Sequence, residues 1–223
     1  MVKNCFRGIE IILFDFEGTL VDFQWNLTGA LHETLEMLKA SGFPTDRLQN
    51  LKYSTLMREA MKMAPEIGQT PDEARNKIGA IYDKYDEDAL TRWTSRPQAR
   101  EFLYALQKKG IKAGLVSNVG KRALEKSLLK LNLENLFEVV ISRNDVRTLK
   151  PGGEGINLAL NRLQVKKEKS LFIGDSLDDI YAAKEAGLKV MVIPGGEYPK
   201  EKLLAANPDF LIQGFDELLV NLS

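Results

Sequence analysis

The chain has 223 residues, 44% of them hydrophobic, so it can bury a full core as one domain with an insertion or as two small domains. Its 31 basic residues (Lys and Arg) equal its 31 acidic residues (Asp and Glu), which excludes the strong basic field that holds nucleic acids or anionic membranes. The one cysteine, Cys5, cannot form an internal disulfide, and the one histidine, His32, leaves no Cys/His metal cluster. With neither a leader peptide pattern nor 18 consecutive apolar residues, the sequence predicts a soluble cytoplasmic protein.

The first predicted strand ends on a carboxylate. Ile11 to Phe14 form a short apolar run, Asp15 follows it directly, and Gly18 lets the chain turn away sharply. Open α/β sheets bind ligands beyond the carboxyl ends of their strands, which makes Asp15 a candidate site residue. The structural alternative is that Asp15 only caps the loop after the strand.

Three helices are predicted after this strand. Leucines at helical spacing indicate a helix from Asn26 to about Ala40, a second is expected from Thr45 to Met63, and a third from Pro71 to about Asp88. No strand signal interrupts them. We therefore expect residues 21–92 to form a helical cap domain that closes over the substrate of Asp15.

Strands alternate with helices in the rest of the chain. The predicted strands are Lys112–Val116, Glu138–Ile141, Ser170–Ile173, Lys189–Ile193 and Asp209–Ile212, and the predicted helices are Pro97–Lys109, Lys121–Leu131, Gly153–Leu163, Leu177–Ala186 and one after the last strand. This alternation indicates parallel strands joined by right-handed crossovers, whose carboxyl ends converge on one edge of the sheet. We expect residues 1–20 and 93–223 to form a Rossmann-like α/β core.

Polar residues follow three of these strands. Ser117 and Asn118 follow the second strand of the chain, Lys150 lies in the loop after the third, and Asp175 and Asp179 follow the fourth. Each also has a structural explanation: Ser117 or Asn118 as a helix N-cap, Lys150 as a solvated loop charge, and the two aspartates as caps that the helix dipole favours. Their order and chemistry together favour one shared site.

Four motifs in this order resemble those of the haloacid dehalogenase superfamily, in the phosphoglycolate-phosphatase-like subgroup with a helical cap after the first strand. The motifs are Asp15-Phe16-Glu17-Gly18-Thr19-Leu20, Leu115-Val116-Ser117-Asn118, Lys150-Pro151 and Gly174-Asp175-Ser176-Leu177-Asp178-Asp179. The resemblance covers nearly the whole chain. It implies a Rossmann-like parallel sheet with a mobile helical cap and, as the commonest activity, Mg²⁺-dependent hydrolysis of small phosphate monoesters.

The resemblance assigns Asp15 as the nucleophile that accepts the phosphoryl group as an aspartyl-phosphate. Asp15, Asp175 and the backbone carbonyl of Glu17 would bind Mg²⁺, since this ion prefers oxygen ligands. Asp179 would hold metal-bound water or orient its neighbour, and Thr19 would tie the loop together by hydrogen bonding.

The phosphate-binding residues are assigned in the same way. Ser117 and Asn118 would bind the phosphoryl oxygens through a hydroxyl and a main-chain N–H near the start of the next helix. Lys150 would lie between Asp15 and the phosphate and stabilise the charge that moves in the transition state.

Glu17 departs from the usual pattern, which has an aspartate there as the general acid and base. Its carboxyl chemistry is the same, but its arm is one methylene longer. The enolase-phosphatases of methionine salvage also carry glutamate at this place, although little else here matches that family. Haloacid dehalogenases carry an aromatic residue and phosphonatases a small one, so Glu17 argues against both of those chemistries.

Besides an enolase-phosphatase-like enzyme, two alternatives remain open at this point. The chain could keep the fold and bind a ligand or partner without turnover, with Glu17 as the lesion, or it could transfer a phosphoryl group to another sugar position. The substrate is not specified by the sequence, although the cap offers polar candidates at His32, Arg47, Lys52, Tyr53 and Arg58. We expect most of them on solvated helix faces, and His32 buried against a backbone partner.

Overall fold

The structure is a computed structural model that describes residues 5–222. Residues 1–4 and 223, which fall within the predicted core ranges, lie outside the described residues. Contacts divide the chain into two compact units, one that ends at Gln24 and resumes at Trp93, and one that comprises Trp25–Arg92. Residues 21–24 therefore belong with the first unit.

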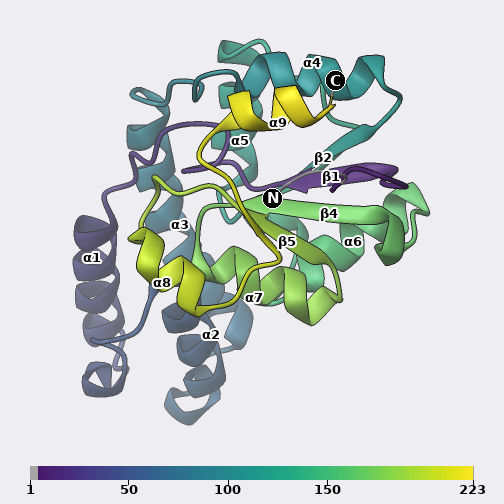
Figure 1. Cartoon of the computed structure of the whole chain (residues 1–223). Helices are drawn as coiled ribbons and strands as arrows, with labels where there is room; N and C mark the ends of the chain where they lie inside the picture. Colours follow the sequence, from purple (N-terminus) through teal and green to yellow (C-terminus); the bar gives the residue numbers. More distant parts are fainter. Residues whose placement is uncertain (1–4, 223) are drawn as a thin grey trace. The chain divides into compact units, whose positions relative to one another are not determined.

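A six-stranded, fully parallel sheet organises the first unit (Figure 1). Its order is β3-β2-β1-β4-β5-β6, with β1 near the centre between β2 and β4. The strands are β1 (Ile11–Phe14), β2 (Lys112–Val116), β3 (Val139–Ile141), β4 (Ser170–Gly174), β5 (Lys189–Val192) and β6 (Phe210–Leu211). The predicted Rossmann-like α/β class is confirmed.

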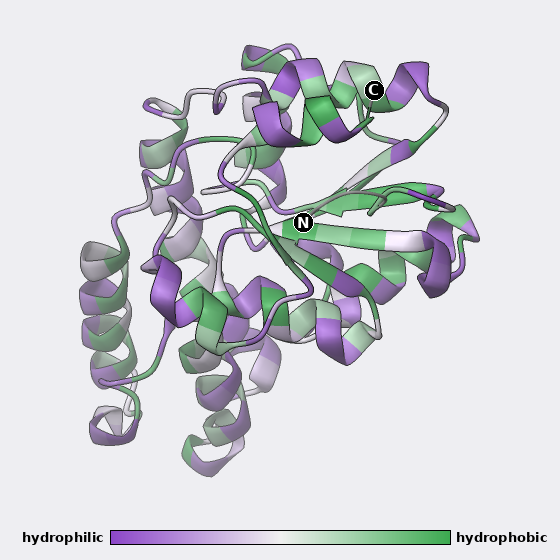
Figure 2. Cartoon of the chain, in the orientation of Figure 1, coloured by the Kyte–Doolittle hydropathy of each residue, from purple (hydrophilic) through white to green (hydrophobic). Residues whose placement is uncertain are grey.

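The central strands are apolar on both faces because helices cover both sides of the sheet. All four residues of β1 are buried, which explains why its sequence is continuously hydrophobic and not alternating. Figure 1 shows α4 and α9 on one side of the sheet and α6 and α7 on the other, and Figure 2 shows that the strands are mostly hydrophobic. The helices are α4 (Ala99–Lys108), α5 (Lys121–Lys130), α6 (Glu154–Leu163), α7 (Leu177–Ala186), α8 (Lys200–Ala205) and α9 (Phe215–Leu222).

The second unit contains three α-helices, α1 (Leu27–Ala40), α2 (Tyr53–Met63) and α3 (Pro71–Leu90). Local signals start two of them. The side chain of Asn26 accepts a hydrogen bond from Gly29 N at 3.0 Å, and Thr70 forms a capping box with Glu73 at the start of α3. An aromatic cluster fills the interior, with the ring of Trp25 in contact with those of Tyr53, Tyr82 and Tyr85.

Two expectations for the second unit were wrong. The chain does not form one helix from Thr45 to Met63, because a 3₁₀ turn at Thr45–Arg47 buries Leu48 and α2 begins only at Tyr53. A turn followed by a helix produced the spacing that predicted a single helix. His32 is exposed and not buried, since α1 buries the opposite line, formed by Ala30, Thr34 and Leu38.

One α-helix among the described residues of the first unit was not predicted. The short helix α8 follows Pro199 and buries one residue, Leu203, so it has almost no apolar periodicity to detect. Within residues 5–222, no helix is long and apolar enough to cross a membrane.

The chain leaves the first unit and returns to it at one place, directly after β1. Asp22 N donates to Thr94 O at 3.1 Å, Arg96 N donates to Leu20 O at 2.9 Å, and Val21 forms an antiparallel bridge with Ser95. These two chain crossings, residues 20–24 and 93–96, are therefore fixed to each other beside the carboxyl end of β1.

Candidate active site

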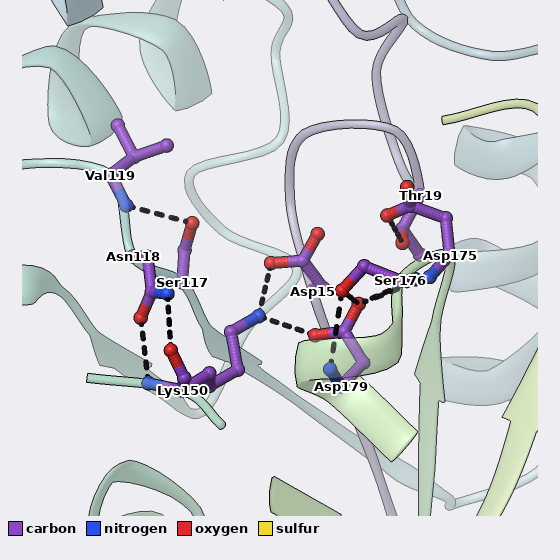
Figure 3. A network of polar contacts seen from close by, with 9 residues as sticks. All are labelled: Asp15, Thr19, Ser117, Asn118, Val119, Lys150, Asp175, Ser176 and Asp179. Carbon is purple, nitrogen blue, oxygen red and sulfur yellow. Dashed lines mark hydrogen bonds and ion pairs between the residues drawn. The ribbon is translucent and has the colours of Figure 1, made fainter. Parts of the chain in front are cut away.

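The topology brings the predicted site residues of three strands to one edge of the sheet (Figure 3). Asp15 follows β1 and Asp175 follows β4, and these strands are paired in register with Phe14 beside Ile173. Asp15 N continues the ladder by donating to Ile173 O at 2.9 Å. The loop after β3 supplies Lys150 to the same edge.

Three buried carboxylates form the centre of the site. Asp15, Asp175 and Asp179 are 6%, 2% and 0% exposed, and one oxygen of each lies within 4.8 Å of the others. Negative charges that are this close and this deeply buried repel each other strongly. The cluster therefore needs cations to compensate its charge.

Lys150 supplies one of these cations. Its Nζ lies 2.5 Å from Oδ1 of Asp15 and 2.6 Å from Oδ1 of Asp179, and the residue is only 5% exposed. Burial by itself would lower the pKa of Lys150, but the charges of Asp15 and Asp179 raise it above its ordinary value. Lys150 is therefore a buried ammonium, and the alternative of a solvated loop charge is wrong.

One ammonium does not neutralise the cluster. Burial raises the pKa of Asp15 to about 6, with Lys150 opposing the rise and Asp179 adding to it. Burial, and then the charges of Asp179 and Asp15, also raise the pKa of Asp175 well above its ordinary value. The remaining negative charge and the all-oxygen donor set fit a hard divalent cation such as Mg²⁺.

Asp179 makes two kinds of contact with its two oxygens. Oδ2 accepts hydrogen bonds from the backbone N–H of Asp175 at 3.1 Å and of Ser176 at 3.0 Å, and from the Ser176 hydroxyl at 2.7 Å. Oδ1 accepts from Lys150. The helix-capping alternative thus describes Asp179 correctly, and the same side chain also fixes the ammonium and the backbone of Asp175.

Asp175 lies in a space that only glycines leave open. A Cβ at Gly18 would lie 2.3 Å from Oδ2 of Asp175, and a Cβ at Gly196 would lie 1.6 Å from the same atom. Thr19 Oγ1 donates to Oδ1 of Asp175 at 3.0 Å, which matches its expected hydrogen-bonding role in the loop. Gly196 was missed by the sequence analysis, because its part depends on a loop that folds back from β5.

Asn118 holds Lys150 through its side chain. Its Nδ2 donates to Lys150 O at 3.1 Å, and its Oδ1 accepts from Lys150 N at 3.0 Å. Ser117 Oγ accepts from Val119 N at 3.2 Å. Neither residue caps a helix, because α5 begins at Lys121 after Gly120. The side-chain amide of Asn118 therefore holds the backbone of Lys150 in the position from which its ammonium reaches the carboxylates. The residue type and sequence position of Asn118 did not predict this contact.

The side chain of Glu17 is held at the two chain crossings. Its Oε1 accepts a hydrogen bond from Gln24 N at 2.8 Å and one from the indole Nε1 of Trp93 at 2.9 Å. Both donors were missed by the sequence analysis, because Gln24 donates from its main chain and Trp93 is 76 residues away from Glu17.

The sequence profile of the family described as "Haloacid dehalogenase-like hydrolase" matches residues 12–193. The chain belongs to this family of hydrolases. Its relatives include the "Phosphoglycolate phosphatase" of Photorhabdus laumondii, 28% identical over 228 residues that cover 98% of this chain and 94% of the relative. The "Phosphoglycolate phosphatase" of Escherichia coli K12 is 28% identical over 235 residues, which cover 97% and 93%.

Solved structures agree with the fold of this haloacid dehalogenase-like hydrolase. A haloacid dehalogenase-like hydrolase from Bacteroides fragilis superposes with a TM-score of 0.68 at 25% identity and covers 94% of this chain and 99% of its own. CbbY from Rhodobacter sphaeroides, in complex with xylulose-(1,5)bisphosphate, superposes with a TM-score of 0.66 at 23% identity and covers 96% and 99%.

Arg96 is a further residue at the edge of this hydrolase's site. Its guanidinium donates to Gly18 O at 2.5 Å and to Pro194 O at 2.9 Å, so it joins the loops that follow β1 and β5. Burial lowers the pKa of Arg96, while the charges of Asp175 and Asp22 oppose that change. Arg96, in the second chain crossing, thus joins the two loops that place Gly18 and Gly196 against Asp175.

Proposed function

We propose that this hydrolase is a Mg²⁺-dependent phosphatase that acts on a small-molecule phosphate monoester through an aspartyl-phosphate on Asp15. The observation that carries the proposal is the buried cluster of Asp15, Asp175 and Asp179 with Lys150 between two of its members. A carboxylate beside cations can approach a phosphate dianion, which it would otherwise repel. The phosphatase names of the two bacterial relatives support the same reaction class.

The residues at the sheet edge suit a double displacement. Asp15 attacks the phosphorus atom, the bond from phosphorus to the leaving oxygen breaks, and Glu17 gives that oxygen a proton. Glu17 then takes a proton from water, the water oxygen attacks the aspartyl-phosphate, and inorganic phosphate leaves while Asp15 is regenerated. Glu17 thus moves a proton in opposite directions in the two steps, first to the leaving oxygen and then from the attacking water.

The buried cluster and its lysine would hold the metal and the phosphoryl group. Asp15, Asp175 and the Glu17 carbonyl would bind Mg²⁺, with Asp179 behind them, and this ion would neutralise charge on the phosphoryl oxygens when bound. Lys150 would exchange part of its contact with Asp15 for a phosphoryl oxygen.

The phosphoryl oxygens would also meet the residues that follow β2. The Ser117 hydroxyl and the main-chain N–H of Asn118 would donate to them, while the Asn118 side chain keeps Lys150 in place. We further propose that the helical unit, Trp25–Arg92, acts as a cap that excludes water other than the attacking molecule.

The proposal is tested with the purified full chain and a panel of phosphate monoesters, with phosphoglycolate as the first substrate. Phosphate release should require Mg²⁺ and stop after addition of EDTA. Asp15→Asn should lower kcat by at least about 10⁴-fold, because it removes the nucleophile. Its circular dichroism spectrum should match the wild type, which controls for folding.

Three other results would each contradict the proposal. Silence over the whole panel, with Mg²⁺-dependent beryllofluoride binding intact, would indicate a protein that binds without turnover. Phosphorus NMR that finds the phosphoryl group on another hydroxyl of the substrate would indicate a phosphomutase. Full activity in Asp15→Asn would exclude the aspartyl-phosphate.

A further inference from the structure

The longer arm of Glu17 ends on a specific donor, the indole N–H of Trp93. We infer that Trp93 is a positioning residue for Glu17, so that the pair acts as a unit in proton transfer to the leaving group. This inference rests on the proposed phosphatase function and on the role of Glu17 within it. It assigns a part in the reaction to a residue outside the four motifs of the sequence.

The contact geometry is well defined. The Nε1 of Trp93 lies 2.9 Å from Oε1 of Glu17, and Gln24 N lies 2.8 Å from the same oxygen. One donor comes from the chain crossing that leaves the sheet unit and the other from the crossing that returns to it. Two N–H groups on one oxygen fix the position of that oxygen and so anchor the end of the side chain.

The indole itself is fixed by packing. Trp93 is 1% exposed, and its ring meets that of Phe16 edge to face at a centroid distance of 5.2 Å and an interplanar angle of 88°. Phe16 is fully buried and lies between Asp15 and Glu17 in the chain. The donor is therefore held against the same loop that carries the nucleophile and the acid.

The length of the Glu17 side chain explains why a fixed donor such as Trp93 is needed. A glutamate has one more rotatable bond than an aspartate, and its carboxylate must be held within hydrogen-bond reach of the leaving oxygen to transfer a proton. A fixed donor at the end of the arm removes that freedom before substrate binds. An aspartate at position 17 would be one methylene too short to keep this contact, so Trp93 matches glutamate and not aspartate.

The simpler explanation is that Trp93 only fills the core. Both explanations predict that the Trp93→Phe variant is less stable than the wild type, because the substitution removes a buried indole. They differ in the chemistry. Loss of positioning harms substrates whose leaving group needs a proton, whereas a general loss of structure harms all substrates alike.

The experiment compares kcat/KM for an alkyl phosphate, taken as the best alkyl substrate of the panel, with kcat/KM for p-nitrophenyl phosphate. Nitrophenolate leaves without a proton, and kcat/KM does not include the later hydrolysis of the aspartyl-phosphate. Trp93→Phe should lower the alkyl value by about tenfold or more and the nitrophenyl value by less than about twofold, a part of the range that general acid catalysis contributes. Phe102→Leu is the matched control, because Phe102 is fully buried in the same unit, and it should lower Tm without changing the ratio of the two values.

Two further proteins separate the loss of the indole N–H from any change in packing that Trp93→Phe causes. The chain has two tryptophans, so in a Trp25→Phe background 3-benzothienylalanine replaces Trp93 alone, keeping its shape and lacking its N–H. This protein should show the same selective loss, measured against the Trp25→Phe parent. In a Glu17→Asp background, Trp93→Phe should leave the ratio of alkyl to nitrophenyl values unchanged, because the contact is already lost.

An unchanged ratio in both Trp93→Phe and the benzothienyl protein, with wild-type activity present, would overturn the inference and leave the phosphatase function intact. A wild type that hydrolyses neither substrate with Mg²⁺ would overturn both.

Discussion

The Nζ of Lys150 lies 2.5 Å from Oδ1 of Asp15, although 135 residues separate them in the chain. The same ammonium lies 2.6 Å from Oδ1 of Asp179. One buried cation thus contacts two of the three carboxylates of the cluster, and we expect the stability of the metal-free protein to depend on it.

Lys150→Met should therefore destabilise the metal-free protein. The variant leaves the carboxylate cluster without its ammonium, and breaking a buried pair in this way costs about 3–5 kcal/mol. Urea denaturation in EDTA measures this loss. Lys169→Met is the control, because its ion pair with Glu10 is half exposed and is worth less than about 1 kcal/mol. Equal losses in the two variants would contradict a special role for Lys150.

Magnesium should stabilise the wild type and fail to stabilise Asp175→Asn. Binding to the folded state alone adds about 2.7 kcal/mol at 100 times Kd, and the carboxylate of Asp175 belongs to the cluster that would hold the ion. Thermal unfolding with MgCl₂, and with NaCl at the same ionic strength, measures the effect. A rise of Tm that is equal in both salts would show screening and not a site.

Gly196→Ala should weaken magnesium binding, because its Cβ would lie 1.6 Å from the Oδ2 of Asp175 and would displace that carboxylate. The concentration of Mg²⁺ that gives half of the maximal activity should rise. Gly79→Ala is the control with the opposite sign. Gly79 lies within α3 with open space at its Cβ, so alanine should add about 0.5–1 kcal/mol of stability. An unchanged magnesium requirement in Gly196→Ala would contradict the close approach.

Asp145→Asn should destabilise the protein at neutral pH and have less effect in acid. Burial raises the pKa of Asp145, but hydrogen bonds from the Ser142 hydroxyl and N–H, and then Arg162, lower it below its ordinary value. A carboxyl whose pKa falls on folding adds stability above its ordinary pKa of about 4 and loses that contribution as the pH drops through the folded value. The expected loss at pH 7 is about 1 kcal/mol, the typical worth of such a hydrogen bond.

Denaturation of wild type and Asp145→Asn at pH 7 and pH 3.5 tests this pH dependence. Ser142→Ala should destabilise the wild type more than it destabilises Asp145→Asn, since both changes open the same capping box. A difference between wild type and Asp145→Asn that grows as the pH falls would have the wrong sign.

The sheet and its ligand edge could be predicted because both are local in the sequence. The apolar run of β1 ends at Asp15, that of β4 ends at Gly174, and parallel pairing then brings Asp15 and Asp175 together. The burial of Lys150 could not be predicted from the residues next to it in the sequence. It depends on the loop after β3 and on the side chain of Asn118, which a strand-end position does not specify.

The contacts of Trp93, Arg96 and Gly196 could not be predicted for a related reason. Each depends on a loop that returns from a distant part of the chain to the end of β1 or β4. Tryptophan, arginine and glycine are also ordinary in loops and cores, so their type carried no signal. The break before α2 was hidden by Leu48, whose burial in a turn imitated helical spacing.

The hydrogen bonds between Asp22 and Thr94, and between Arg96 and Leu20, join the two chain crossings to each other. The 68 residues of Trp25–Arg92 connect to the first unit only through these two chain crossings. The six strands of the sheet pair without residues 25–92. A helical insert of another size could therefore replace these residues while Asp15 keeps its hydrogen bond to Ile173 and Glu17 keeps its hydrogen bonds to Gln24 and Trp93. We therefore expect that the helical insert and the residues at the sheet edge can change independently of each other in evolution.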